Sequence, residues 1–465
     1  MIPWGPYIYA KSPLFLQTFF LNLMGFKLQL QRFGKNLEML LKWFEETERW
    51  SPSEWTCYQE ERLKVLIQHA YETVPFYRER MKAINLVPSD IRSLADLPKI
   101  PLLTREEVKK NLCWMISREY KKRDLVHGLT SGTTGSPLDV YYDKGMVLIN
   151  NAVDWRQKAW AGLRLGEPHA VILGRVTVPI PQRRPPFWRM NFIHKQLWLS
   201  AFHMSDENLG YYLEKLEKFR PKVIEGYPST VYILARYLNR KNSALPLKAA
   251  LTSSETLFPY QKEEIEKAFQ CRIFDFYGLA ERVIFASECS SHDGKHLNCE
   301  YGVTEFVDEK GHPVPAGQPG WMVGTSLHNF GMPMIRYLTS DQSSWKDRAC
   351  PCGRKLPLMG AVTTKQDELV LTPDGRWISP SVLTHPFKPM RNILESQIVQ
   401  EKLDLVAIKI VRSPGYSRED SVKLMAGLRE RLGESVEIRL DFVDHIAREK
   451  SGKFRWVISK VQRLE

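Results

Sequence analysis

The chain has 465 residues, too many for a single hydrophobic core of ordinary size, so roughly two or three domains are expected. Hydrophobic residues account for 43% of the chain and charged residues for 26%, which excludes an intrinsically disordered protein. The formal net charge of +13 suits a polyanionic ligand such as a nucleotide, or an anionic membrane surface. Nucleic acid is disfavoured as a partner, because the sequence contains no recognisable nucleic-acid-binding module.

An apolar segment lies near the N-terminus. Residues 13–26 are mostly apolar, but this segment is too short to span a bilayer. The favoured interpretation is a helix packed on the main domain, and the alternative is peripheral attachment to the inner face of a membrane. The seven cysteines are an odd number, which argues against a disulfide framework, so we expect a cytoplasmic protein.

The middle of the chain alternates helix and strand patterns. Apolar spacing predicts helices within 36–82, and Thr104 ahead of two glutamates predicts the start of a capped helix. Short β-rich segments are expected at 140–142, 171–173, 223–224, 247–251 and 273–277, with helices at 206–219 and 260–269. A stretch rich in proline and arginine at 180–191 reads as a solvated surface loop, the alternative being a mobile loop that faces a substrate. This alternation predicts an α/β fold with a largely parallel sheet and helical cover.

The last hundred residues predict a compact α+β unit. Residues 405–411 read as a strand, and Ser417 caps a helix that ends at Gly433. Apolar and charged residues then alternate over 436–442, as in a half-buried strand. We therefore expect a large N-terminal domain over 1–363, with an apolar segment at 1–35, and a small C-terminal domain over 368–465 joined to it by a hinge at 364–367.

One run of small and hydroxyl residues predicts a phosphate-binding loop. It extends over 127–137 and reads His-Gly-Leu-Thr-Ser-Gly-Thr-Thr-Gly-Ser-Pro. Gly132 and Gly135 allow the backbone to turn and to approach a ligand closely, while hydroxyls and backbone N–H groups suit phosphate oxygens. It is not a Walker A loop, because no Gly-Lys-Ser/Thr follows at the required spacing.

Three further motifs follow in a fixed order. Residues 274–281 read Phe-Asp-Phe-Tyr-Gly-Leu-Ala-Glu, residues 335–341 read Ile-Arg-Tyr-Leu-Thr-Ser-Asp, and residues 449–455 read Glu-Lys-Ser-Gly-Lys-Phe-Arg. With the glycine-rich loop, this order resembles the adenylate-forming superfamily, which includes the acyl-CoA synthetases. Within it the chain is most similar to the phenylacetate-CoA ligase-like branch, including the CapK-type proteins associated with surface polysaccharide synthesis. The resemblance implies a large adenylation domain followed by a small, mobile C-terminal domain.

The resemblance also implies an activity. It is ATP-dependent carboxylate ligation, in which an acyl-adenylate forms and the acyl group passes to a thiol, CoA being the expected acceptor. A second hypothesis keeps the adenylate but transfers the acyl group to an amine of a sugar or amino acid. A third is a nonenzymatic scaffold that binds nucleotide. A homodimer is a further expectation from the relatives, and the identity of the carboxylic acid is left open.

The family's roles fall on particular residues of this chain. The resemblance assigns catalysis to Lys453, Glu281 and Thr134, with Glu281 as the Mg²⁺ ligand and Lys453 reaching the α-phosphate of ATP. ATP contacts are further assigned to Thr130, Ser131, Gly132, Thr133, Thr134, Gly135, Ser254, Glu255, Tyr277, Gly278 and Asp341, the last of these accepting from the ribose hydroxyls. Two positions depart from the pattern: Ser136 replaces a lysine common in relatives, and Lys365 replaces the usual arginine near the hinge residue Asp367.

The substrate pocket and a zinc site are also expected from the resemblance. His203, Tyr227 and Pro228, together with Tyr277 and Gly278, match segments near the acyl pocket, although a core histidine is an equal interpretation of His203. Thiolates and an imidazole in four-coordinate geometry suit structural Zn²⁺. The candidate ligands are Cys289, His296, Cys350 and Cys352, with Cys299 as an alternative ligand and unliganded buried cysteines as the alternative interpretation.

Overall fold

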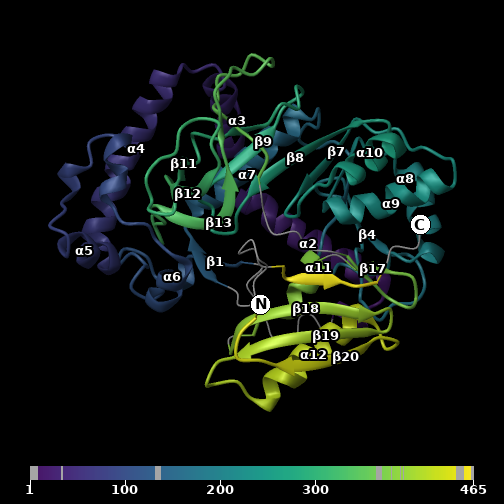
Figure 1. The fold of residues 1–465 in the computed structure, drawn as a ribbon. Coiled ribbons are helices and arrows are strands. Elements are labelled where there is room, and N and C mark those ends of the chain that lie inside the picture. Colours follow the sequence, from purple (N-terminus) through teal and green to yellow (C-terminus); the bar gives the residue numbers. More distant parts are fainter. Residues whose placement is uncertain are drawn as a thin grey trace.

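The computed structural model describes residues 9–32, 35–130, 138–362, 369–378, 380–387, 389–390, 392–446 and 455–461. A large body carries the N-terminal helices and a wide sheet, and a smaller C-terminal sheet lies against one side of it (Figure 1). The helices of the body that precede the sheet are α2 (Leu14–Arg32), α3 (Lys35–Thr47), α4 (Pro52–Thr73), α5 (Pro75–Lys82), α6 (Arg105–Asn111) and α7 (Lys144–Trp160).

Side-chain caps fix where several of these helices begin. Ser51 and Glu54 form a reciprocal capping box at the start of α4, and Thr104 and Glu107 do the same for α6. Asp143 caps α7 by accepting from the backbone N–H of Met146 at 2.8 Å. The predicted helix start after Thr104 is therefore confirmed, and it places the first turn of α6 beside the site described below.

The main sheet has ten strands in the described part of the chain. Their order is β14-β15-β10-β9-β8-β7-β6-β3-β5-β4. The central strands β8, β7, β6, β3 and β5 run parallel, and the strands at both edges pair antiparallel. The bounds are β3 (His169–Ile172), β4 (Trp188–Asn191), β5 (Gln196–Leu199), β6 (Val223–Gly226), β7 (Ala249–Ser253), β8 (Arg272–Gly278), β9 (Phe285–Glu288), β10 (Lys295–Leu297), β14 (Trp345–Lys346) and β15 (Leu358–Met359).

Helices cover the parallel strands. They are α8 (Asp206–Phe219), α9 (Pro228–Arg240) and α10 (Pro259–Phe269). Two smaller sheets complete the body: the antiparallel pair β1 (Val126–Leu129) and β2 (Asp139–Tyr142), and the sheet β11 (Gly302–Val307), β12 (Gly320–Ser326) and β13 (Tyr337–Ser343). The predicted α/β class and its largely parallel sheet are confirmed.

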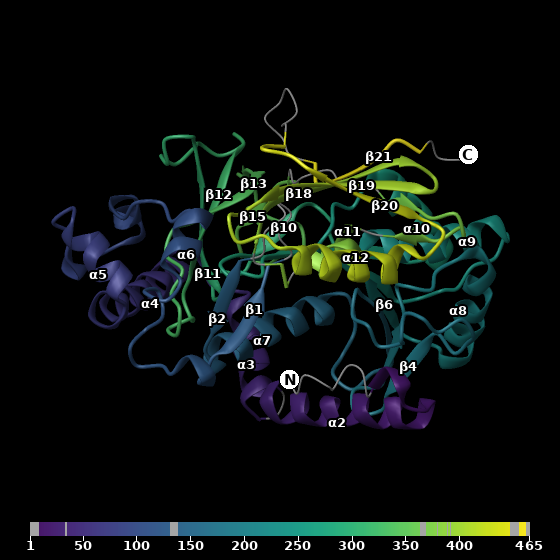
Figure 2. The same cartoon turned by 90° about the horizontal axis from the view of Figure 1, so that it is seen from below.

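The C-terminal unit is a four-stranded sheet with a helix on one face (Figure 2). The strand order is β20-β19-β18-β21, and α12 connects the parallel strands β19 and β20. Its elements are β16 (Val370–Leu371), β17 (Trp377–Ile378), α11 (Pro380–Leu383), β18 (Ile393–Lys402), β19 (Leu405–Arg412), α12 (Arg418–Leu432), β20 (Glu437–Phe442) and β21 (Val457–Ser459). The predicted strand, capped helix and strand over 405–442 are confirmed.

The two parts share a packed interface. One hydrophobic cluster includes body residues such as Ile172 and Phe202 and C-terminal residues such as Val382 and Trp456. The buried Arg376 donates to the carbonyl oxygens of Arg431 at 2.8 Å and of Phe202 at 3.3 Å. This arginine therefore satisfies the end of α12 and also reaches across to the body.

The expected surface loop at 180–191 is only partly correct. Residues 188–191 form β4, and Arg189 is buried rather than solvated. Its guanidinium donates to Gln17 at 2.9 Å and to Gln182 at 3.0 Å. Local sequence could not reveal this partner, because Gln17 lies far away in the chain. Among the described residues, no helix combines the length and the hydropathy needed to cross a bilayer.

Candidate active site and metal centre

A cavity of about 1170 Å³ lies between the body and the C-terminal unit. Its walls come from the first turn of α6, the end of β1, the segment after β7, the end of β8 and the β13 strand. The C-terminal unit contributes Thr384, His385, Arg455 and Trp456. The motif residues Thr130, Tyr227, Ser254, Glu255, Tyr277, Gly278, Glu281 and Asp341 all line this single space.

Glu281 is held from two sides. Its carboxylate is buried, and Oε1 accepts from the Tyr337 hydroxyl at 2.9 Å. The Arg105 guanidinium lies 3.5 Å from the same oxygen and also donates to the Thr130 hydroxyl at 2.9 Å. Thr130 in turn accepts from the N–H of Leu138, the first described residue after the glycine-rich loop. A fixed carboxylate and a fixed cation therefore flank the base of that loop.

Asp341 and Tyr277 form a second pair in the cavity. The Tyr277 hydroxyl donates to Asp341 Oδ2 at 2.7 Å. Burial, followed by the negative charge of Asp341, raises the pKa of Tyr277 well above its usual range, so the phenol stays a hydrogen-bond donor at neutral pH. The carboxylate is thereby oriented toward the cavity, while Tyr277 presents its ring to the same space.

Residues after β7 form another part of the cavity wall. Ser254 has a φ of 69°, an unusual conformation for a residue other than glycine, and it places the next residue over the start of α9. There, Glu255 accepts from the backbone N–H of Ser229 at 3.2 Å. Burial raises the pKa of the neighbouring Tyr227 to about 12, so it too stays protonated.

A buried ionic cluster also lines this cavity. Lys295 of β10 lies 3.0 Å from Asp275 and 3.7 Å from Glu288. Thr252 donates to the other oxygen of Asp275 at 2.8 Å. Burial raises the pKa of Asp275 despite the ammonium of Lys295. The cluster joins β7, β8, β9 and β10 at the cavity wall.

Two expected pocket residues lie elsewhere. His203 is buried in the body, where Ser200 bonds its Nδ1 at 2.7 Å, Nε2 contacts the Ile180 carbonyl at 3.2 Å, and the ring stacks on Phe187. Burial lowers its pKa to about 4. Pro228 is buried as the first residue of α9. Neither is among the residues that line the cavity, and both pack the fold, so their assignment to the substrate pocket stays a prediction.

Several expected site residues lie outside the described part of the chain. These are Ser131, Gly132, Thr133, Thr134 and Gly135 of the glycine-rich loop, the hinge residue Asp367, and Lys453. Their assigned roles stay predictions. Arg455, two positions beyond Lys453, does line the cavity.

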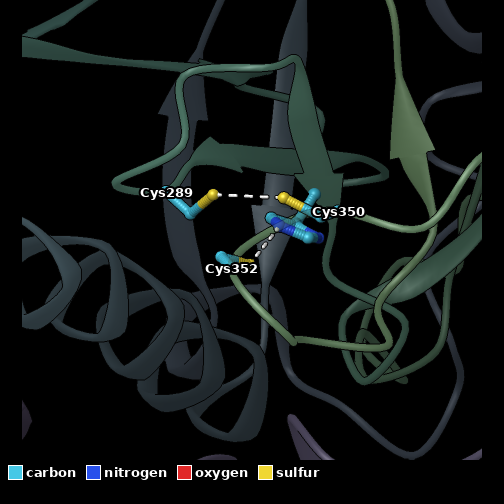
Figure 3. Close-up of side chains that lie close together, drawn as sticks. Cys289, Cys350 and Cys352 are labelled. Atoms are coloured by element: carbon cyan, nitrogen blue, oxygen red, sulfur yellow. Dashed lines mark hydrogen bonds between the residues drawn. The ribbon is translucent and has the colours of Figure 1, made fainter.

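Four potential metal ligands come together at the edge of the sheet. Their ligand atoms, from Cys289, His296, Cys350 and Cys352, all lie within 4.8 Å of one another. Figure 3 shows the sulfur atoms of Cys289 and Cys350 pointing toward each other. Their Sγ–Sγ distance is 3.5 Å, and Cys352 Sγ lies 3.3 Å from Nε2 of His296. Cys299 is buried elsewhere, against Trp55 and Leu356, and is not part of the group.

The surroundings of this group suit metal binding. His296 bonds the carbonyl of Leu356 through Nδ1 at 3.0 Å, which fixes the ring and leaves Nε2 facing the thiols. Burial raises the pKa of Cys289 to about 12. Burial would also raise the pKa of Cys352, but hydrogen bonds from the N–H of Arg354 and from neighbouring thiols lower it on balance. Three thiols and one imidazole at this spacing match the donor set of structural zinc.

Sequence reasoning missed Arg105. The sequence around Thr104 predicts only the start of a helix. It does not indicate that Arg105, the next residue, lies beside Glu281, which is 176 positions away. The C-terminal contributors His385 and Trp456 were missed for the same reason. Their contribution depends on how the two parts pack against each other.

Comparison with solved structures identifies the fold. The structure of 2-hydroxyisobutyryl-CoA ligase in complex with 2-HIB-AMP and CoA aligns with a TM-score of 0.57 at 20% identity, covering 90% of this chain and 92% of that one. The same enzyme with 2-HIB-AMP in the postadenylation state aligns with a TM-score of 0.56 at 21% identity, covering 90% and 92% of the two chains. The fold is that of the adenylate-forming ligases.

Sequence comparison narrows the resemblance. Protein CapK of Staphylococcus aureus is 27% identical over 98% of this chain and 99% of its own length. The phenylacetate-coenzyme A ligase of Thermus thermophilus is 29% identical over 67% of this chain and 71% of that protein. Residues 370–460 match the family described as the CapK C-terminal domain. The predicted resemblance to the phenylacetate-CoA ligase-like and CapK-like branch is confirmed.

Proposed function

We propose that the protein is an AMP-forming ligase that activates a carboxylic acid with ATP and transfers the acyl group to a thiol, with CoA as the acceptor. One observation carries this proposal: Glu281, Asp341 and Thr130 line a single cavity, with Arg105 bridging the first and last of them. Relatives named as phenylacetate-coenzyme A ligases support the class of reaction. The volume of about 1170 Å³ suits a nucleotide together with a second substrate.

The first half-reaction brings two anions together. A carboxylate oxygen attacks the α-phosphorus, the bond from that phosphorus to the bridging oxygen breaks, and pyrophosphate leaves with the electron pair. In this reaction Asp341 accepts from the ribose hydroxyls, the Tyr277 ring packs against the nucleotide, and Arg105 supplies positive charge near the departing phosphates. The assigned contacts of 131–135 and Lys453 complete the proposal.

The second half-reaction releases AMP. The CoA thiol loses its proton to solvent, its sulfur attacks the acyl carbonyl carbon of the adenylate, the bond from that carbon to the AMP oxygen breaks, and AMP leaves with the electron pair. The C-terminal unit already contributes to the cavity wall, so its placement controls which acceptor can enter. Transfer to an amine would follow the same atom balance, with the amine nitrogen as nucleophile.

Glu281 fits the role of the Mg²⁺ ligand. It is a buried carboxylate that the Tyr337 hydroxyl and the Arg105 guanidinium hold in place, and a hard divalent cation prefers such an oxygen. When bound, the cation would offset negative charge on the phosphate oxygens.

Cys289, His296, Cys350 and Cys352 fit a structural Zn²⁺ ion. Their donor atoms are of the right kind and gather within 4.8 Å, and the His296 ring is fixed by a backbone carbonyl. Such an ion would stabilise the fold and takes no part in the chemistry. Metal analysis of the purified protein at about one zinc per chain would support the assignment, and less than about 0.2 per chain would end it.

The function is tested by pyrophosphate release over a panel of aryl, fatty, hydroxy and amino acids. We expect at least one acid to give release that depends on ATP and is lost in Glu281→Gln. CoA and a set of amines are then compared as acceptors that turn over the adenylate. If no acid gives pyrophosphate release above that of the Glu281→Gln variant while ATP still binds, the protein is a nonenzymatic nucleotide-binding scaffold and not a ligase. If only amines release AMP, the acceptor is an amine.

A further inference from the structure

Helix α2 has an apolar side that faces outward. Phe15, Phe19, Leu23 and Phe26 share one face by the helical period, and all four are exposed, with Phe15 at 70% and Phe19 at 58%. A helix that packs on a globular body ordinarily buries such a face. Met24 and Phe20 extend the exposed apolar surface on the same side.

Gln17, Leu21 and Gly25 share the side of α2 that faces the body, and they are less exposed than the phenylalanines. Gln17 is buried and accepts from Arg189 at 2.9 Å. Asn22 donates to the carbonyl of Met190 at 2.9 Å and accepts from the N–H of Phe192 at 2.7 Å. Gly25 lies so close to Asn191 that an added Cβ would stand 2.9 Å from its Oδ1. These contacts fix the orientation of α2 on the body.

The β4–β5 turn adds to the same surface. Phe192, whose backbone N–H donates to Asn22, has a side chain that is 65% exposed, and the next residue, Ile193, is also exposed. Figure 2 shows α2 along an outer edge of the molecule, beside β4 and away from the C-terminal strands β19 and β21. The apolar surface is thus built from two segments and lies away from the C-terminal strands.

The surrounding charge is positive. The first acidic residue of the chain is Glu38, and none lies between Glu167 and Asp206, so both segments that build this surface lack carboxylates. Lys11, Lys27 and Lys195 are exposed on them. An apolar face rimmed by cations is the pattern of a helix that lies in the interface of an anionic bilayer.

We infer that α2 and the β4–β5 turn form a docking surface for an anionic membrane, on which the protein lies without crossing it. The rings of Phe15, Phe19 and Phe192 enter the boundary between headgroups and acyl chains, and Lys27 and Lys195 contact lipid phosphates. A second copy of the chain is the competing occupant. Self-association would bring like charges together with no carboxylate on either segment to offset them.

The test uses the full-length protein and sedimentation with vesicles of phosphatidylcholine alone or with about 30% phosphatidylglycerol. We expect binding to the anionic vesicles that weakens with salt. Phe15→Gln/Phe19→Gln/Phe192→Gln should lower the partition coefficient by at least about tenfold. Lys27→Gln/Lys195→Gln should remove the preference for anionic lipid.

A matched control separates this surface from exposed apolar side chains in general. Val65→Gln/Ile84→Gln/Val422→Gln changes three residues that are similarly exposed on other elements, and it should bind vesicles as the natural protein does. Equal melting temperatures and equal pyrophosphate release would show that all the variants fold. The inference is overturned if the natural protein does not bind, if the phenylalanine variant binds equally well, or if light scattering reveals a dimer that this variant dissociates.

Discussion

Arg105 gives the sharpest test of the proposed chemistry. The glycine-rich loop carries Ser136 where relatives often have lysine, so the positive charge near the phosphates must come from another element. Arg105 lies at the first position of α6, 2.9 Å from the Thr130 hydroxyl and 3.5 Å from Glu281. We therefore expect Arg105→Ala to impair adenylation specifically.

The magnitude follows from the loss of one preorganised donor in a partly buried site. Removing such a group costs about 2.7–4 kcal/mol of transition-state stabilisation, or roughly 100- to 1,000-fold in rate. Glu281 keeps the Tyr337 hydroxyl at 2.9 Å, so the variant does not leave that carboxylate without a donor. Arg105→Lys keeps the charge but loses the planar fork, and an intermediate loss of about tenfold is expected.

Two rates should be measured with the acid that gives the fastest reaction. The first is pyrophosphate release from ATP, and the second is thioester formation from CoA and the synthetic acyl-adenylate. Arg105→Ala should reduce only the first, leaving the second within about threefold. Arg123→Ala, which removes an exposed arginine, is the matched control. Pyrophosphate release by Arg105→Ala within threefold of this control would refute the role assigned to Arg105.

Three further changes test other parts of the structure. Asp341→Asn should raise the KM for ATP by about 10- to 100-fold, because a charge-assisted acceptor for the ribose is lost; an unchanged KM would contradict that role. Cys352→Ser should lower the bound zinc and reduce the melting temperature by at least about 3 °C, whereas an equal zinc content would argue against its ligation. The pKa of His203 falls from 6.5 to about 4 on burial, so the unfolded chain binds the extra proton between these values and stability is lost as pH falls. Denaturant unfolding should show that His203→Gln removes about 2 kcal/mol of the stability difference between pH 7 and pH 5, and an unchanged difference would contradict the shift.

Periodicity and caps predicted much of the fold, because those signals are local. The helix 206–219 and the capped helix after Ser417 follow from apolar spacing and N-cap chemistry, which operate within a few residues. The strand at 188–191 was missed since its buried arginine depends on Gln17, a partner 172 positions away. The domain boundary at 363–368 lies outside the described residues and stays a prediction.

The residues of the candidate site also differ in whether local sequence could predict them. The motifs brought Tyr277, Glu281 and Asp341 to notice, and the structure places all three at one cavity. Arg105 was not predicted, because its contact with Thr130 depends on the packing of distant segments. His203 was a candidate site residue, but its ring nitrogens form hydrogen bonds within the core. Residue chemistry can nominate candidates, whereas tertiary contacts decide which of them face the substrate.

The cysteine–histidine group also has a consequence for how the enzyme would fail. The segment that carries Cys350 and Cys352 also supplies β14 and β15, and β15 pairs with β10, the strand that carries His296. From these same pieces of chain, Lys295, Lys346 and Gly360 reach the catalytic chamber. With zinc bound there as we propose, oxidation of the thiols or removal of the ion would therefore loosen one wall of the cavity.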